Sequence, residues 1–349
     1  MKNKIIFLGL ISSLLLMGAG CSKVQVVSND GGVYKSFDNG TRWEQKVAVL
    51  SVGQPKSIAT INVAKLVFDP SDANLLYAVS SDGRLFTTLD AAESWQELTK
   101  VPKGIINSIA FNLQTGETVY LAIGNKIYKS DCSCRSWQNV YLEALPNIQV
   151  MALAVDGGDV NKVLAGLSDG RIIKSSDGGN NWSTFYDFKN KIAQIMFSPN
   201  STGVIYVNTN GGGLWRSTDA GNSWQNLDQN LKSFRGGRDV SLMVADATRP
   251  DSLVISSTYG LLRSNDGGQS WTDYKLLSQP GKATISAFGF NPKNPNEIYY
   301  TTNNTLYRSS DGGAKWQTKP LPSKRTPTVL LVDPNNPHVL YLGLARIEK

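Results

Sequence analysis

Acidic side chains at a regular spacing are the first residues in this sequence that could do chemistry. An aspartate recurs in the pattern Ser/Thr-x-Asp-x-Gly-x-x-Trp, and glycoside hydrolases use paired carboxylates as acid and as nucleophile or base. Equivalent copies on separate turns cannot all belong to one active site. We therefore predict that these aspartates are structural, accepting hydrogen bonds from turn amides, and we assign no catalytic residue. The six copies that keep the aspartate hold Asp38, Asp90, Asp177, Asp219, Asp266 and Asp311.

The tryptophan that ends each copy gives the repeat its period. Successive copies are separated by 42 to 52 residues, a spacing typical of propellers and other repeat arrays. Glycine allows positive φ in a tight turn, and the indole ring supplies an apolar plate between sheets. The seven tryptophans are Trp43, Trp95, Trp137, Trp182, Trp224, Trp271 and Trp316.

A second repeat unit, made of short apolar strands separated by turns, precedes each copy and indicates an all-β fold. The apolar strand that opens this unit occurs seven times, but its last occurrence, within 326–345, is not followed by a copy of the Trp-containing pattern. The first such copy, at 36–43, has no complete first strand before it. We predict a seven-bladed β-propeller with four-stranded blades, in one domain over 32–349. The N- and C-terminal strands share one blade, because ring closure removes exposed edge strands; an open array is the alternative.

The N-terminus has the layout of a secretory signal, with Lys2 and Lys4, an uncharged apolar run and then Gly18-Ala19-Gly20-Cys21. It resembles the lipobox of bacterial lipoproteins. This resemblance implies a signal peptide over 1–20, acylation of Cys21, an anchor and linker over 21–31, and an exported, membrane-anchored protein facing the periplasm or cell exterior. The alternative is an uncleaved membrane anchor, although the apolar run is shorter than the ~20 residues that a span needs.

Two cysteines replace the aspartate and glycine of one copy, at Cys132 and Cys134. Export permits a disulfide between them, which would be a covalent substitute for the hydrogen-bonded turn; a redox-active pair is the rival interpretation. The sequence has no Cys/His cluster of the kind that holds zinc. We expect no metal and no cofactor.

Basic residues gather in the links between blades, which share the face opposite the Trp-containing turns. A basic face attracts acidic partners, and the guanidiniums of Arg235 and Arg238 could bind a carboxylate bidentately. The predicted partner is an acidic protein segment, with an anionic glycan or lipid surface as alternatives and solubility alone as the simplest explanation. We expect a monomer and no nucleic acid. The candidate binding residues are Lys103, Lys232, Arg235, Arg238, Lys282, Lys324 and Arg325.

The repeat closely resembles the Asp-box, or BNR repeat, of sialidases, sortilin and related propellers. Seven copies in one exported chain resemble the photosystem II stability/assembly factor family, as in Gly-Leu-Trp-Arg-Ser-Thr-Asp-Ala-Gly-Asn-Ser-Trp at 213–224. This resemblance implies a non-catalytic assembly factor for a membrane complex. The segment 333–341 is equally similar to xyloglucanase-type and sortilin-type propellers, so a carbohydrate-binding or glycoside-hydrolase propeller is the alternative. The Phe-Arg-Ile-Pro signature of sialidases is absent.

Overall fold

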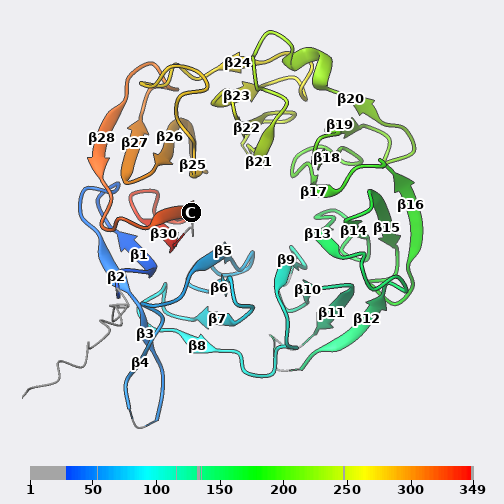
Figure 1. Ribbon diagram of the computed structural model, residues 1–349, viewed down its shortest axis with the longest axis horizontal. Coiled ribbons are helices and arrows are strands. Elements are labelled where there is room, and N and C mark those ends of the chain that lie inside the picture. Colours follow the sequence, from blue (N-terminus) through cyan, green and yellow to red (C-terminus); the bar gives the residue numbers. More distant parts are fainter. Residues whose placement is uncertain are drawn as a thin grey trace, which may run out of the picture.

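Seven four-stranded antiparallel sheets are arranged in a ring in the computed structural model (Figure 1). The structure describes residues 29–346 apart from 53, 115, 132, 133, 135 and 247. The predicted seven-bladed β-propeller is therefore confirmed.

From the innermost strand outward, the first four blades are β29 (Thr326–Val332), β30 (Leu340–Ala345), β1 (Gly32–Ser36) and β2 (Glu44–Lys46); β5 (Val63–Phe68), β6 (Leu76–Ser80), β7 (Leu85–Thr88) and β8 (Gln96–Glu97); β9 (Ile106–Phe111), β10 (Val119–Ile123), β11 (Lys126–Ser130) and β12 (Gln138–Leu142); and β13 (Val150–Val155), β14 (Val163–Leu167), β15 (Arg171–Ser175) and β16 (Ser183–Asp187). The other three are β17 (Ile192–Phe197), β18 (Ile205–Thr209), β19 (Gly213–Ser217) and β20 (Gln225–Asn226); β21 (Val240–Ala245), β22 (Leu253–Ser257), β23 (Leu261–Ser264) and β24 (Thr272–Asp273); and β25 (Ala287–Asn291), β26 (Asn294–Thr302), β27 (Thr305–Ser309) and β28 (Gln317–Pro320).

The ring closes as predicted, with strands from both ends of the chain in one blade. Strand β1 pairs antiparallel with β30, and Tyr34 lies opposite Leu342 in the register. The C-terminal strands β29 and β30 form the inner half of this blade, while β1 and β2 form the outer half. Closure thereby pairs strand edges that would otherwise be open at both ends of the array.

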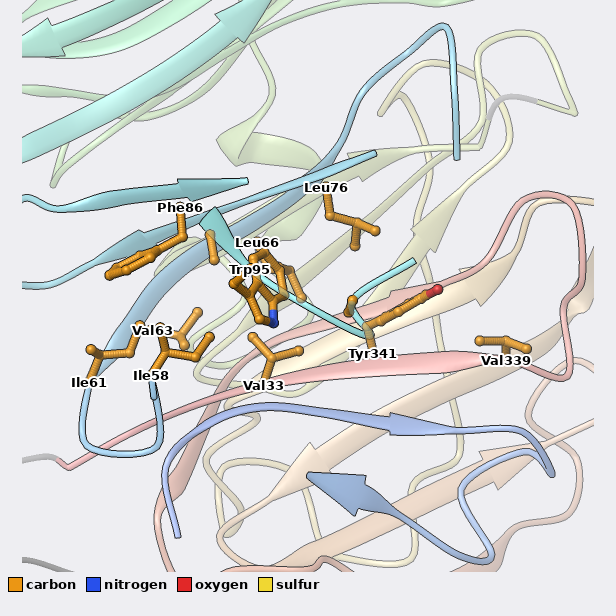
Figure 2. Close-up of a cluster of buried hydrophobic side chains, with 12 residues drawn as sticks. Val33, Ile58, Ile61, Val63, Leu66, Leu76, Phe86, Trp95, Val339 and Tyr341 are labelled. Atoms are coloured by element: carbon orange, nitrogen blue, oxygen red, sulfur yellow. The ribbon is translucent and has the colours of Figure 1, made fainter. Parts of the chain in front are cut away.

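Apolar clusters fill the spaces between neighbouring blades. Every residue of the second strands β6, β10, β14, β18, β22 and β30 is buried, because both faces of a blade pack against a neighbour. Figure 2 shows one such cluster, in which Val33 and Tyr341 of the closing blade meet Phe86 and Trp95 of the next blade. Burial of this kind supplies most of the driving force for folding.

Two ordered segments lie in links where the sequence indicated only connections. A short hairpin, β3 (Ala48–Val49) and β4 (Lys56–Ser57), projects from the rim of the propeller (Figure 1). Its base is tied to the next blade, since the Leu50 amide donates to the Trp95 carbonyl and the Trp95 amide to the Ala48 carbonyl, both at 2.8 Å. The other segment is a 3-10 helix, η1 (Asp228–Leu231), which buries Leu231. Neither has an equivalent in the repeat, so periodicity could not reveal them.

Across residues 29–346, as far as the structure describes them, no helix is long and apolar enough to cross a membrane. The predicted signal peptide and Cys21 lie outside the described residues.

Candidate functional site

The Asp-box turns are closed by a repeated set of hydrogen bonds. In the turn after β19, the Ser217 hydroxyl donates to Asp219 Oδ1 at 2.8 Å and accepts from the Gly221 amide at 2.8 Å. The Asp219 carboxylate also accepts from the amide and hydroxyl of Ser223, at 2.8 and 2.6 Å. The same serine or threonine bond to the aspartate recurs at Asp38, Asp90, Asp177, Asp266 and Asp311.

These bonds keep the Asp-box carboxylates ionised. Hydrogen bonds from Arg42 to Asp38, from Asn181 to Asp177 and from Ser223 to Asp219 hold the pKa of each aspartate at about 2. Bonding to the charged form lowers the pKa of a carboxylic acid. An ionised carboxylate cannot act as a general acid, and the oxygens of Asp219 are already engaged in closing its turn.

The Asp-box tryptophans pack between blades, and two of them also bond across the gap. Trp95 Nε1 donates to the Lys46 carbonyl at 2.9 Å, and Trp316 Nε1 donates to the Lys275 carbonyl at 2.8 Å. Trp182 and Trp271 instead donate to the glycine carbonyl of their own turn. The indoles are thus part of the frame that fixes one blade against the next.

The divergent turn after β11 keeps part of the Asp-box geometry. The Cys134 amide donates to the Ser130 hydroxyl at 3.1 Å, as the glycine does in the other copies, and Cys134 has a φ of 66°. Burial raises the pKa of the Cys134 thiol to about 12, which opposes formation of the reactive thiolate. Cys132 lies outside the described residues, so the disulfide between the two stays a prediction.

The basic candidates fall into two groups once their surroundings are known. Six are exposed, and none of the six forms an ion pair with a residue that the structure describes; these are Lys103, Lys232, Arg235, Arg238, Lys282 and Lys324. All six lie in links between one blade and the next. They remain our predicted binding residues.

Arg325 differs from the expectation, because it is only 5% exposed and belongs to the ring closure. Its Nε donates to Asp30 Oδ1 at 3.1 Å, and its Nη1 donates to the Ile61 carbonyl at 3.2 Å. These contacts join the segment before β1 to the links before β5 and β29. Sequence reasoning placed Arg325 in the correct link but could not show that its side chain points inward.

The loop that carries Arg235 and Arg238 is ordered by its aromatic residue. Phe234 packs edge-on against Tyr259, with ring centroids 5.1 Å apart. The Gly237 amide donates to the Phe234 carbonyl at 2.8 Å, and Gly236 has a φ of 85°, which favours glycine. The loop therefore presents both guanidiniums from a fixed backbone, which reduces the entropy lost when a partner binds.

Acidic residues in the same links are mostly engaged. Glu143 Oε2 accepts from Arg171 Nη2 at 2.9 Å, and Asp187 is paired with Lys189. Asp228 accepts a hydrogen bond from the Leu214 amide at 3.1 Å. Basic residues of these links are engaged as well, since Lys275 is paired with Asp273 and Arg325 with Asp30, so the face stays basic but gains no excess from these pairings.

The buried carboxylate of Glu297 is also held in the ionised form. Burial raises the pKa of Glu297, but hydrogen bonds from Asn291, Tyr299 and Arg308 lower it by a larger amount, so the net shift of the pKa is downward. Tyr299 donates to Glu297 at 2.7 Å and Arg308 Nη2 at 2.6 Å. Every aspartate or glutamate whose pKa departs from its ordinary value, within the described part of the chain, departs downward. No group of three or more His, Cys, Asp or Glu side chains suited to a metal ion occurs there either.

The central channel contains a residue that the sequence analysis did not single out. The channel encloses about 690 Å³ and is lined by the innermost strands of the seven blades. Among the described residues, Lys65 on β5 is the one charged residue in its wall. An alignment of the first-strand repeats could have revealed it, because Lys65 is a charged residue at a position where the other blades have none. The equivalent residues are Ser108, Ala152, Gln194, Leu242, Ala287 and Val329.

The known proteins to which the chain is similar include both an assembly lipoprotein and a xyloglucanase. The photosystem II assembly lipoprotein Ycf48 of a Prochlorococcus marinus strain is 26% identical over 188 residues, which cover 52% of this chain and 51% of the relative. A xyloglucanase of a Paenibacillus species is 24% identical over 256 residues, covering 70% of this chain and 23% of the enzyme. The chain thus spans about half the length of the assembly lipoprotein that it matches, and a smaller share of the xyloglucanase.

Solved structures show the same fold. A GH74 xyloglucanase from Xanthomonas campestris has a TM-score of 0.65 at 22% identity, with 82% of this chain and 51% of the enzyme covered. A structure described as YCF48 bound to D1 peptide has a TM-score of 0.62 at 17% identity, with 82% of this chain and 94% of that chain covered. The family model described as photosynthesis system II assembly factor YCF48 matches residues 12–209, more than half of the chain. On this match, and on its seven Asp-box blades, the chain belongs to the YCF48 assembly factor family.

Proposed function

We propose that this protein is an exported lipoprotein that binds an acidic segment of a protein partner through its link face, as a non-catalytic assembly factor for a membrane complex. The observation that carries the proposal is the set of six exposed cations on the inter-blade links, while most acidic residues of those links are already engaged. A relative in the family is named as an assembly lipoprotein, and a similar fold has been solved with a peptide bound.

Arg235 and Arg238 are the residues through which we expect the strongest contact. Arginine pairs bidentately with carboxylates, and rim charges mainly raise the rate of association. The decisive comparison is retention of partners from native membranes by the wild-type chain and by Arg235→Ala/Arg238→Ala. We expect the double variant to lose a defined complex that the wild type retains.

Lys315 offers a matched control, because it is exposed on the opposite face, in the Asp-box after β27. Lys315→Ala should retain the complex as well as the wild type does. Equal retention by all three proteins would reject the link face as the docking surface. Loss of binding in Lys315→Ala as well would point to general charge attraction.

Membrane attachment is tested separately. We propose that Cys21 is acylated, so Cys21→Ser should move the protein from the membrane fraction to the soluble fraction. Continued membrane association of the variant would support the alternative of an uncleaved anchor.

A carbohydrate-directed function is the second candidate, supported by the likeness to xyloglucanases. Glycosidic cleavage needs a protonated carboxylic acid with a raised pKa, and the described residues include no carboxyl group shifted in that direction. Release of reducing sugar from xyloglucan by the purified protein would overturn the non-catalytic assignment.

A further inference from the structure

The central channel has the size and the wall of a ligand site. Its volume of about 690 Å³ lies within the range of roughly 300–1,000 Å³ that is usual for small-molecule pockets. Large apolar side chains from six blades dominate the wall. They include Val67, Phe68, Ile109, Met151, Leu242, Val244, Phe290, Val329 and Leu331.

Polar groups in the wall are already used to join neighbouring blades. The Ser108 hydroxyl accepts from the Leu153 amide at 3.1 Å, and the Thr328 hydroxyl donates to the Val63 carbonyl at 2.6 Å. Gln194 donates to the Met243 carbonyl at 2.7 Å and accepts from its amide at 3.0 Å. Because these bonds satisfy the side chains, they leave few groups in the wall to recognise a polar ligand.

Lys65 is the exception. No hydrogen bond or ion pair of its amine is found among the described residues, and the wall they form contains no Asp, Glu, Arg or His. Gln194, at the equivalent place in another blade, joins two blades, whereas Lys65 joins none. Burial lowers the pKa of Lys65, as expected when an ammonium group loses water without gaining a partner. A carboxylate placed beside the amine would supply that partner.

We propose that the channel binds a small apolar molecule carrying one carboxylate, with the carboxylate paired to Lys65 and the hydrocarbon part packed on the apolar wall. An oligosaccharide fits poorly, since it would need many free polar groups to replace its hydration. A highly acidic segment also fits poorly, because one cation cannot neutralise several carboxylates in an apolar channel. The site is distinct from the link face proposed to bind a protein partner.

Sodium decanoate is a suitable probe, used below its micellar concentration with the full-length chain carrying Cys21→Ser in detergent-free buffer. Isothermal titration calorimetry should show saturable binding to this protein. Lys65→Met keeps the length and apolar character of the side chain but removes the charge. We expect it to weaken decanoate binding about tenfold or more, because a charge-assisted hydrogen bond is lost.

Two further probes separate the parts of the ligand. Decanol has the chain without the charge, and acetate has the charge without the chain; both should bind at least tenfold more weakly than decanoate. Equal binding of decanoate by wild type and Lys65→Met would overturn the role of the amine, and so would equally strong binding of decanol. Equally strong binding of acetate would overturn the role of the apolar wall. A melting temperature of Lys65→Met that is no lower than that of the wild type shows that the comparison concerns binding and not folding.

The same variants distinguish this inference from the proposed function. Arg235→Ala/Arg238→Ala should bind decanoate like the wild type, and Lys65→Met should retain the protein partner. If Arg235→Ala/Arg238→Ala lost decanoate binding, the carboxylate would lie on the link face and the channel site would be rejected.

Discussion

Replacement of Ser217 by alanine tests whether the Asp-box is held together by its buried hydroxyl. Ser217 is 1% exposed, and its Oγ accepts from the Gly221 amide at 2.8 Å and from the Asp219 amide at 3.3 Å. Alanine removes this acceptor and leaves the buried Gly221 amide without a partner. An unsatisfied buried donor costs about 1–3 kcal/mol. For a chain of this size, that cost corresponds to a fall in melting temperature of about 1–4 °C.

The assay is thermal unfolding followed by circular dichroism, with two comparison variants in the same turn. Ser223→Ala removes an exposed hydroxyl that donates to Asp219 at 2.6 Å, and an exposed loss of this kind should change stability by no more than about 0.5 kcal/mol. Ser217→Thr should keep most of the stability, because Thr88 makes the same contacts in the turn after β7. Equal melting temperatures of Ser217→Ala and Ser223→Ala would show that the hydrogen bond of the buried Gly221 amide is not the source of the stability.

Three further outcomes follow from other parts of the frame. Arg325→Met should destabilise the ring closure by about 2–3 kcal/mol, since breaking a buried charge pair is costly but Asp30 is partly exposed; Lys324→Met, one residue away and exposed, should be nearly neutral in the same denaturant titration. In the reduced protein, the Cys134 thiol, with its pKa raised to about 12, should be alkylated at pH 8 far more slowly in the native state than in guanidinium, and equal rates would show that it is accessible and ionised. The Asp-box carboxylates have a folded pKa below the unfolded value, so their stabilisation is complete above about pH 4 and is lost as the pH falls towards 2; a melting temperature that did not change between pH 5 and 2 would contradict this.

The fold was predictable because the Asp-box pattern recurs seven times along the chain, with its tryptophan in every copy and its aspartate in six. A single turn with an aspartate, a glycine and a tryptophan would have been weak evidence, but copies at a near-constant period left few other arrangements. Ring closure was predictable for a similar reason: the unmatched strand at 326–345 and the unmatched turn at 36–43 complete each other, and β30 indeed pairs with β1.

The candidate site was less accessible to sequence analysis, because side-chain direction in a link is not periodic. Lys324 and Arg325 are neighbours in one basic segment, yet the first is exposed and the second is buried against Asp30. The hairpin β3–β4 likewise depends on bonds to Trp95 that join different blades. Such contacts arise only when the ring has assembled.

Residues on the two faces of the propeller therefore have different roles. On the Asp-box face, each serine, aspartate and glycine is committed to closing its own turn, and substitution there should first change stability. On the link face, Lys232, Arg235 and Arg238 are exposed while the backbone beneath the arginines is fixed by Phe234. Substituting them should change binding with little effect on folding. Lys65 belongs to a third category, since it lies in the inner strand repeat but takes no part in joining blades. A ligand is best sought at a residue that differs from its equivalents in the repeat and makes no contact that stabilises the fold.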